Sequence, residues 1–312
     1  MTPRVLYLGG SGRSGTTLIE RLTGELPGVC PLGEVVHLWE RGLRGNEPCG
    51  CGTPLRECPF WTKVGERAFG GWDRFDVDRM LALKASVDRN RFIPELAAPR
   101  LRGSLARDVA EYVAAYRELY AAAAEVSGAD VVVDSSKHAS LAHALRWCDD
   151  LDLRVLQVVR DPRAVAYSWT KEMRRNAGAD MDRFTPAAAA NLWTVMNGAF
   201  HLLASRGVTL RRGRYEDFIA APVAGVREIA RFAGVPVRAG DLAYLGDDRA
   251  GLTVAHTASG NPMRFVTGEV ALRRDEAWRS ELPAADRRRV TSLTLPLLAR
   301  YGYLPPVRGR AA

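Results

Sequence analysis

Short segments suited to strands alternate with longer segments in which apolar residues recur at helical spacing. Four short segments are predicted as strands: 4–8, 131–134, 154–159 and 209–215. Helices are predicted from the spacing of apolar residues over seven segments: 16–26, 106–126, 141–148, 164–174, 186–204, 223–233 and 284–301. Strands that alternate with helices predict an α/β fold, a mostly parallel sheet flanked by helices on both faces.

Two regions interrupt this alternation. Residues 40–60 are rich in Gly, Pro and Cys and predict an irregular loop, and helical patterns dominate 61–126. We therefore expect a single domain over residues 1–312 with a Cys/Gly/Pro-rich loop and a helical insertion at about 40–129. Residues 240–280 lack periodicity and predict a long loop. The closing helix is expected to be interrupted or bent at Pro296.

Composition and charge narrow the class of protein. Apolar residues make up 47% and charged residues 26% of the 312, which excludes disordered and fibrous chains. Forty-four basic against 36 acidic residues give a net charge of +8, which suits an anionic ligand. No basic run interleaved with aromatic residues predicts nucleic-acid binding. The apolar runs are too short for an integral membrane segment, and the N-terminus lacks a secretory signal, so we expect a cytoplasmic protein.

The first predicted strand leads into a glycine-rich loop, G-S-G-R-S-G-T-T at 10–17, and then a helix. This context presents backbone N–H groups and a helix N-terminus to a phosphate. Gly10, Gly15 and Thr17 match the G-x-x-x-x-G-K-[ST] pattern of nucleotide hydrolases, but Thr16 replaces the lysine and Arg13 supplies a basic residue. Because that lysine serves a triphosphate beside Mg²⁺, its loss predicts a different anionic donor and no required metal.

Residues 13–17, R-S-G-T-T, resemble the 5′-phosphosulfate loop of sulfotransferases that use 3′-phosphoadenosine 5′-phosphosulfate (PAPS), above all the tyrosylprotein and bacterial types. A second segment, V-V-R-D-P-R-A-V-A-Y-S at 158–168, is similar to the family's 3′-phosphate segment, which implies that Arg160 and Ser168 hold this phosphate. R-Y-E-D-F at 214–218 resembles a segment whose tyrosine, here Tyr215, contacts the adenine region. G-N-P-M-R-F at 260–265 is similar to a C-terminal donor-binding stretch.

The resemblance implies a P-loop fold, PAPS as co-substrate, 3′-phosphoadenosine 5′-phosphate (PAP) as product, and no metal. It implies these donor-binding residues: Gly12, Arg13, Ser14, Gly15, Thr16, Thr17, Arg160, Ser168, Tyr215, Asn261 and Arg264. The acceptor is then a hydroxyl or amine of a small molecule, carbohydrate or lipid-like compound. Residues 62–129 lie outside the resemblance, and there we expect acceptor specificity. The oligomeric state is not predicted.

Transfer to a hydroxyl requires a general base near the loop. Glu34, in P-L-G-E at 31–34, resembles the family's G-E element, which carries the catalytic glutamate. In the tyrosylprotein enzymes this element is G-E-E, and its second Glu is catalytic. Here Val35 takes the place of that second Glu, and the spacing from the glycine-rich loop to the glutamate is one residue longer. His37 is the rival base, because the cytosolic type uses a histidine. Lys137 follows a strand and either stabilises charge on the leaving oxygen beside Arg13 or is a solvated helix-start residue. Alternative functions are a P-loop kinase using ATP–Mg²⁺, which Thr16 disfavours, and a non-catalytic nucleotide-binding protein.

Cys49, Cys51 and Cys58 lie close together in the irregular loop. Three thiols suggest zinc, but a fourth ligand is required, and Cys30, His37 or water are the candidates. Because no second C-x-x-C is present, a loop without metal is the preferred interpretation. Cys148 is expected to be an ordinary buried thiol.

Overall fold

The computed structural model describes residues 2–171 and 183–304, and its centre is a five-stranded sheet in which every neighbouring pair is parallel. The strand order is β2-β3-β1-β4-β5. The strands are β1 (Arg4–Gly10), β2 (Val29–Gly33), β3 (Val131–Lys137), β4 (Asp152–Val159) and β5 (Thr209–Arg214). The predicted α/β class with a mostly parallel sheet is confirmed.

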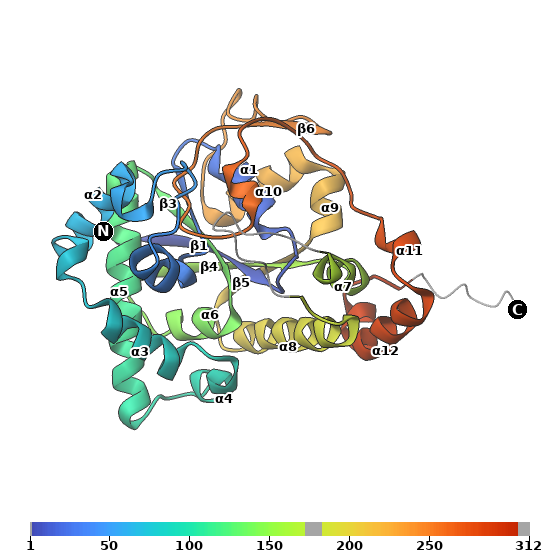
Figure 1. Ribbon diagram of the computed structural model, residues 1–312, viewed down its shortest axis with the longest axis horizontal. Helices are drawn as coiled ribbons and strands as arrows, with labels where there is room; N and C mark the ends of the chain where they lie inside the picture. Colours follow the sequence, from blue (N-terminus) through green and yellow to red (C-terminus); the bar gives the residue numbers. More distant parts are fainter. Residues whose placement is uncertain (1, 172–182, 305–312) are drawn as a thin grey trace, which may run out of the picture.

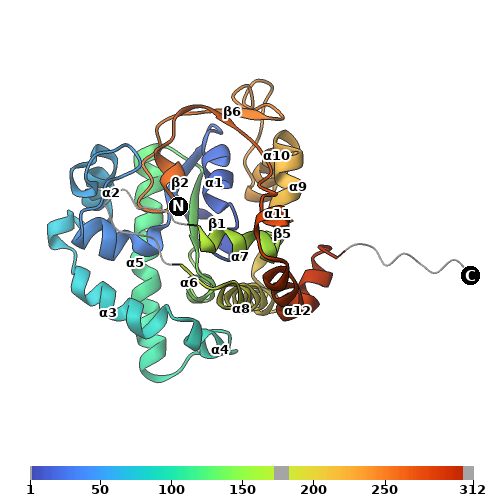
Figure 2. The same cartoon turned by 45° about the vertical axis from the view of Figure 1, so that its right-hand side comes forward.

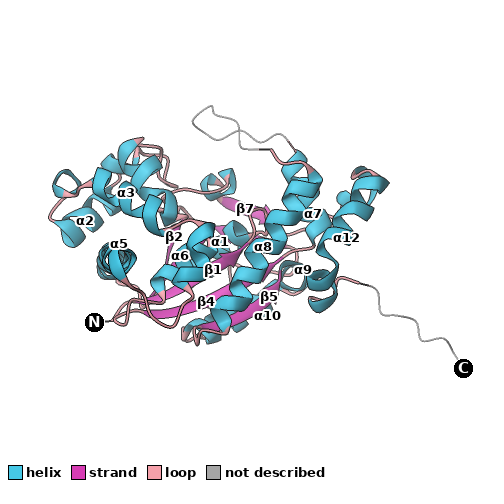
Figure 3. Cartoon of the chain, turned by 90° about the horizontal axis from the view of Figure 1, so that it is seen from below, coloured by secondary structure: helices cyan, strands magenta, loops and turns pink. Residues whose placement is uncertain are grey.

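Helices cover both faces of the sheet because side chains alternate between the faces along each strand. In β1, Val5 and Tyr7 face one buried cluster, and Leu6 and Leu8 face the other. Helices α6 (Ala139–Leu145) and α8 (Pro186–Ala204) cover the first face. The opposite face packs against α1 (Thr16–Gly24), α9 (Tyr215–Ala220) and α10 (Pro222–Ala233). Figure 1 shows these two layers above and below the strands, and Figure 3 shows α6 and α8 lying across the sheet.

The predicted helical insertion lies beside the β2 edge of the sheet (Figure 2). Its helices are α2 (Pro59–Phe69), α3 (Val77–Val87), α4 (Ile93–Leu96) and α5 (Gly103–Ser127). Tyr112, Tyr116 and Tyr120 follow one another at four-residue spacing on α5 and are fully buried in the cluster that also contains Val5 of β1. The insertion therefore shares a core with the sheet, as a single domain requires; the single-domain organisation over 1–312 stays a prediction.

The remaining helices, strands and turns connect or flank these elements. They are α7 (Pro162–Thr170), α11 (Trp278–Glu281), α12 (Ala284–Arg300), the strands β6 (Arg249–Leu252) and β7 (Gly268–Ala271), and the short turns η1 (Val35–His37), η3 (Leu55–Glu57), η4 (Trp72–Arg74), η5 (Asn90–Phe92) and η6 (Pro262–Phe265). A π-helical segment, η2, covers Leu38–Arg44. In α12 the helix continues through Pro296 to Arg300, so it is not interrupted there.

The structure differs from the sequence prediction at three further places. The strand β2 was not predicted, because Pro31 reads as a helix stop; a proline is compatible with an edge strand, and β2 pairs only with β3 within the sheet. Residues 240–280 contain the antiparallel pair β6–β7 as well as loop. Helix α7 begins at Pro162 and ends at Thr170; residues 172–174 of the helix predicted over 164–174 lie outside the described residues.

Candidate active site

All five strands of the sheet end at a candidate site residue. The glycine-rich loop follows β1, Glu34 follows β2, Lys137 ends β3, Arg160 follows β4, and Tyr215 follows β5. The carboxyl edge of a parallel sheet is where ligands bind in open α/β folds. A cavity of about 480 Å³ lies at this edge. Twelve predicted residues line it: Gly12, Arg13, Gly15, Thr16, Thr17, Glu34, His37, Lys137, Arg160, Ser168, Tyr215 and Asn261.

The glycine-rich loop is shaped to present backbone donors. Gly15 has a φ of 88°, in the left-handed region, and a Cβ there would lie 2.3 Å from the Tyr215 ring. Helix α1 then begins without a side-chain cap and without an acidic residue in its first turn, while Thr16 and Thr17 line the cavity. An uncapped helix N-terminus attracts an anion. The loop geometry therefore fits a phosphate or sulfate group.

Arg13 supplies the positive charge of this loop. Its guanidinium carbon lies 4.8 Å from the centre of the Trp169 ring, and burial lowers the pKa of Arg13. The ring has room because residue 12 is a glycine, whose Cβ would lie 2.6 Å from it. Trp169 also lines the cavity and was missed in the sequence analysis; its position next to Ser168 was the available signal.

Arg160 connects the segment at 158–168 to the glycine-rich loop at 10–17. It is only 8% exposed and donates a hydrogen bond of 3.1 Å to the backbone carbonyl of Arg13, 147 residues away. Its guanidinium lies 5.0 Å from the Tyr215 ring centre and 3.5 Å from a carboxylate oxygen of Asp275. Lys171 lies 3.7 Å from the same carboxylate. The negative charge of Asp275 therefore offsets positive charge from Arg160 and Lys171. Asp275 was not predicted from the sequence.

Glu34, His37 and Lys137 form one group on the wall of the same cavity. Glu34 is 8% exposed and is ion-paired with the Lys137 ammonium. Lys137 has a φ of 68°, a conformation uncommon for a residue with a side chain. His37 Nε2 lies 3.7 Å from Glu34 Oε2, and burial together with the charge of Arg41 holds the pKa of His37 well below its ordinary value. The lowered pKa makes His37 a weaker proton acceptor than an ordinary histidine.

The buried carboxyl group of Glu20 positions the turn that carries Glu34. Glu20 accepts hydrogen bonds of 2.6 Å from the Gly33 backbone N–H and from the Ser135 hydroxyl, and so joins the ends of β2 and β3. Gly33 has a φ of 79°, and a Cβ there would lie 2.8 Å from the Ser259 carbonyl. Burial raises the pKa of Glu20 to about 8.

Replacing Glu20 by glutamine is expected to change how stability depends on pH. Native Glu20 keeps its proton up to about pH 8, whereas an unfolded glutamate releases it near its ordinary value of 4.5. The free energy of unfolding of the wild type therefore falls as pH rises through this window, by at most about 1.4 kcal/mol per pH unit from this group. Glu20→Gln lacks this loss, so its stability relative to the wild type increases towards pH 8.

Urea unfolding at several pH values between 5 and 8.5 measures this difference. Glu66→Gln, at an exposed position on α2, is the matched control and should follow the wild-type curve. Parallel curves for Glu20→Gln and the wild type would show that Glu20 is ionised in the native state.

Two predicted donor-binding residues do not line the cavity. The Ser14 side chain is buried beside Gly10, and its hydroxyl has no hydrogen-bond partner among the described residues. Arg264 is buried and donates to the backbone carbonyls of Thr257, at 2.8 Å, and Pro48, at 2.6 Å. The expected donor contact of Arg264 is not supported, because its guanidinium holds two backbone segments together. Asn261 and Met263 are the residues of this stretch that line the cavity.

The insertion contributes to the same cavity. Asn90, in η5, and Arg41, in the π-helical segment, line it together with Leu192 and Met196 of α8. These side chains add both polar and apolar surface to the cavity that Glu34 also lines. No local motif in the sequence identifies these residues. Asn90 does lie within 62–129, where we expect acceptor specificity.

Among residues 2–171 and 183–304, no helix combines the length and apolar character that crossing a bilayer requires. No curated protein matches the sequence. One similar solved structure is the sulfotransferase domain of the olefin synthase from Synechococcus PCC 7002, with 20% sequence identity, 95% of each chain covered and a TM-score of 0.49. A second is sulfotransferase STF9 from Mycobacterium avium, with 14% identity, 97% of this chain and 78% of that chain covered, and a TM-score of 0.49. A third is the sulfotransferase domain from the curacin biosynthetic pathway, with 15% identity, 94% of this chain and 98% of that chain covered, and a TM-score of 0.46.

A family model described as a sulfotransferase domain matches residues 120–290. This match covers more than half of the 312 residues and contains Lys137, Arg160, Ser168 and Tyr215. It agrees with the family resemblance of the segment at 158–168, which lies within the match, whereas the loop at 13–17 lies outside it. The chain therefore belongs to the sulfotransferase family.

Proposed function

We propose that this sulfotransferase takes its sulfuryl group from PAPS and transfers it to a hydroxyl or amine of a small-molecule, carbohydrate or lipid-like acceptor. The observation that carries the proposal is the contact between the two motifs. Arg160, from the segment resembling a 3′-phosphate site, is hydrogen-bonded to the loop resembling a 5′-phosphosulfate site, and both line one cavity. A nucleotide with phosphate groups at both ends of its ribose matches this pair of cationic sites.

The donor is assigned to the cationic side of the cavity. Arg13 and the backbone amides of 12–17 would bind the 5′-phosphosulfate, since an uncapped helix start and a guanidinium both favour anions. Arg160 and Ser168 would bind the 3′-phosphate, and Asp275 would give up its contact with Arg160 as the phosphate arrives. The Tyr215 ring would contact the adenine region, with Asn261 nearby on the cavity wall.

The transfer step needs position and charge more than covalent chemistry, as in phosphoryl transfer. The acceptor oxygen or nitrogen forms a bond to sulfur while the bond between sulfur and the 5′-phosphate oxygen breaks, and PAP leaves. The acceptor proton goes to the carboxylate of Glu34. Lys137, which contacts Glu34, would stabilise negative charge on the leaving oxygen together with Arg13. His37 adjoins Glu34 and would hold its carboxylate in orientation.

The acceptor is assigned to the side of the cavity formed by the insertion and α8. Asn90 and Arg41 offer hydrogen-bond donors there, and Leu192 and Met196 offer apolar contact. This combination suits a hydroxyl-bearing molecule with an apolar portion. Acceptor specificity is therefore proposed to depend on Asn90 and Arg41 more than on the donor-binding loop.

Purified protein incubated with PAPS and pools of hydroxyl and amine acceptors should release PAP and yield a sulfated product by mass spectrometry. Because sulfation and phosphorylation add nearly the same mass, the nucleotide product is measured as well. PAP should raise the melting temperature, ATP–Mg²⁺ should not, and turnover should be the same with and without added Mg²⁺. ADP release from ATP would support the kinase alternative, and PAP binding without turnover on any pool would support the non-catalytic one.

A further inference from the structure

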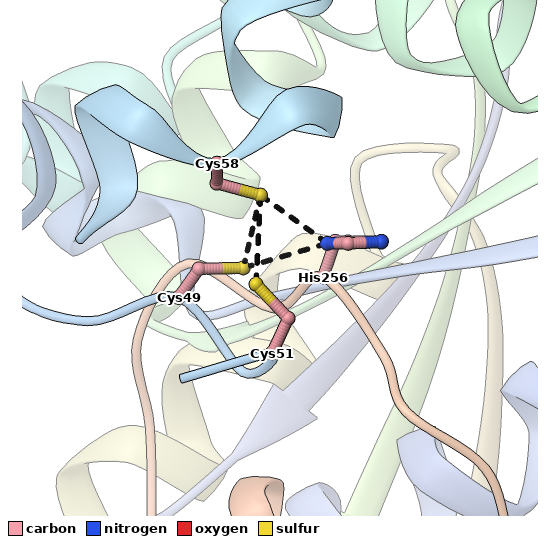
Figure 4. A group of neighbouring side chains, drawn as sticks. All are labelled: Cys49, Cys51, Cys58 and His256. Carbon is pink, nitrogen blue, oxygen red and sulfur yellow. Dashed lines mark hydrogen bonds between the residues drawn. The ribbon is translucent and has the colours of Figure 1, made fainter. Parts of the chain in front are cut away.

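A second group of reactive side chains lies outside the active-site cavity. Cys49, Cys51 and Cys58 of the irregular loop meet His256, which precedes the segment carrying Asn261. One potential ligand atom from each of the four residues lies within 4.8 Å of all the others, and among the described residues this is the group with such an arrangement. Figure 4 shows the three sulfur atoms and the His256 Nδ1 directed towards a common point. Cys49 and Cys58 are fully buried, and Cys51 is half-buried.

The distances between the four atoms match tetrahedral zinc coordination. Zn–S bonds of about 2.3 Å and Zn–N bonds of about 2.0–2.1 Å place tetrahedral sulfurs about 3.8 Å apart and a sulfur about 3.6 Å from a nitrogen. The Cys58 sulfur lies 3.6 Å from that of Cys49 and 3.7 Å from that of Cys51. His256 Nδ1 lies 3.2 Å from the Cys58 sulfur and 3.8 Å from the Cys49 sulfur. Disulfide bonds, at about 2.05 Å, are excluded at these separations.

The surrounding structure holds the ligands in place. The Trp61 indole donates a 3.0 Å hydrogen bond to the His256 carbonyl, and the Phe60 ring stacks on the imidazole at 5.3 Å. The Gly50 backbone N–H donates to the Thr257 carbonyl at 2.9 Å, and a Cβ at Gly50 would lie 2.4 Å from the Ala255 carbonyl. The loop and the His256 segment can therefore approach this closely only with glycine at position 50.

We propose that Cys49, Cys51, Cys58 and His256 bind a structural Zn²⁺ ion. Three thiolates and an imidazole complete the tetrahedral coordination that structural zinc sites use, which leaves no protein-derived ligand missing. The preferred sequence interpretation, a loop without metal, omitted His256 because it lies 198 residues beyond Cys58. Neither Cys30 nor His37, the fourth ligands considered from the sequence, belongs to the group: Cys30 lies on β2, and His37 lines the active-site cavity.

The site connects the irregular loop to the active site through the backbone that follows His256. Ala258 donates to the Leu32 carbonyl at 2.8 Å, and the Glu34 N–H donates to the Ser259 carbonyl at 3.2 Å. Asn261 then reaches the cavity. Zinc bound to His256 would therefore anchor the segment that holds the Glu34 backbone, whereas the sulfuryl transfer itself takes place away from the metal.

Metal analysis of the full chain, purified without chelator or added zinc, tests the proposal. We expect one zinc ion per chain in the wild type. Cys51→Ser and His256→Ala should lose it, and His256→Cys should keep it, because a thiolate can replace the imidazole in a four-thiolate site. Cys30→Ser and Cys148→Ser are the matched controls and should retain full zinc content. Cobalt substituted for zinc should give the intense visible absorption of tetrahedral thiolate coordination.

Each other outcome contradicts the proposal. Wild-type protein that is folded, contains no zinc and does not take up zinc or cobalt would overturn it. Zinc retained in both Cys51→Ser and His256→Ala would place the metal elsewhere, and iron at full occupancy would identify a different metal. A mass lower by two hydrogen atoms than that of the fully reduced, metal-free chain would indicate a disulfide in place of the metal. These measurements do not depend on the donor or the acceptor, so they separate the zinc site from the proposed activity.

Discussion

Glu34→Gln is expected to lower the rate of sulfuryl transfer about 10²- to 10⁴-fold, the usual contribution of a positioned general base. Glutamine keeps the size of the side chain and can still accept a hydrogen bond from Lys137, which contacts Glu34 in the native protein. It cannot take the acceptor's proton. Donor affinity should change little, because the phosphate groups of the donor are assigned to Arg13, Arg160 and the loop amides and not to Glu34.

Single-turnover sulfation at saturating PAPS measures this effect, with PAP binding followed by calorimetry in parallel. His37→Ala is the companion variant. Because the lowered pKa makes His37 a weaker proton acceptor than an ordinary histidine, its loss should cost less than the loss of Glu34. A folded His37→Ala variant without activity, beside Glu34→Gln at nearly the wild-type rate, would identify His37 as the base instead.

Arg160→Ala should weaken binding of PAP far more than binding of its 3′-dephospho analogue. The charge-assisted hydrogen bond to a 3′-phosphate is lost in only one of these complexes, which corresponds to roughly 1.5–3 kcal/mol, or about 10- to 150-fold in affinity. Arg160 also donates to the Arg13 carbonyl, so a part of the loss is common to both nucleotides. The difference between the two nucleotides, not the loss itself, reports the phosphate contact.

Calorimetric titration of Arg160→Ala and Asp275→Asn with PAP and with the 3′-dephospho analogue measures that difference. Asp275→Asn is the matched control at the other end of the ion pair. Because Asp275 competes with a phosphate for the Arg160 guanidinium, its neutralisation should leave PAP affinity unchanged or improve it. Equal losses for PAP and the dephospho analogue in Arg160→Ala would assign the 3′-phosphate to another part of the protein.

The sequence was sufficient to predict the cavity-lining residues that immediately follow a recognisable strand or glycine-rich loop. Arg13, Arg160 and Tyr215 were identified this way because local pattern and motif coincide at those positions. The edge strand β2 was missed because Pro31 and the flanking glycines hide its short apolar run. Even so, the G-E motif identified Glu34, which lines the cavity, and its role as general base stays a prediction.

Residues whose role depends on distant contacts had no comparable signal. Asp275 contacts Arg160, and His256 contacts Cys58, across more than 100 residues of sequence. Neither residue lies in a local pattern that predicts its partner. Arg264 is the opposite case, because it belongs to a family-like stretch and yet its guanidinium donates hydrogen bonds to backbone carbonyls. Local sequence identifies chemical groups, whereas tertiary packing decides which of them face the cavity.

The segment at 256–261 has a consequence for how the protein is made. It satisfies backbone groups of Leu32 and Glu34 more than 200 residues after they have been synthesised. A nascent chain that still lacks this segment leaves the outer edge of β2 uncovered, and an uncovered strand edge is a site of aberrant pairing between chains. Glu34 thus reaches its final position only after residues 256–261 have been synthesised. Ribosome-bound chains truncated before residue 256 should therefore contain the phosphate loop but lack a competent base.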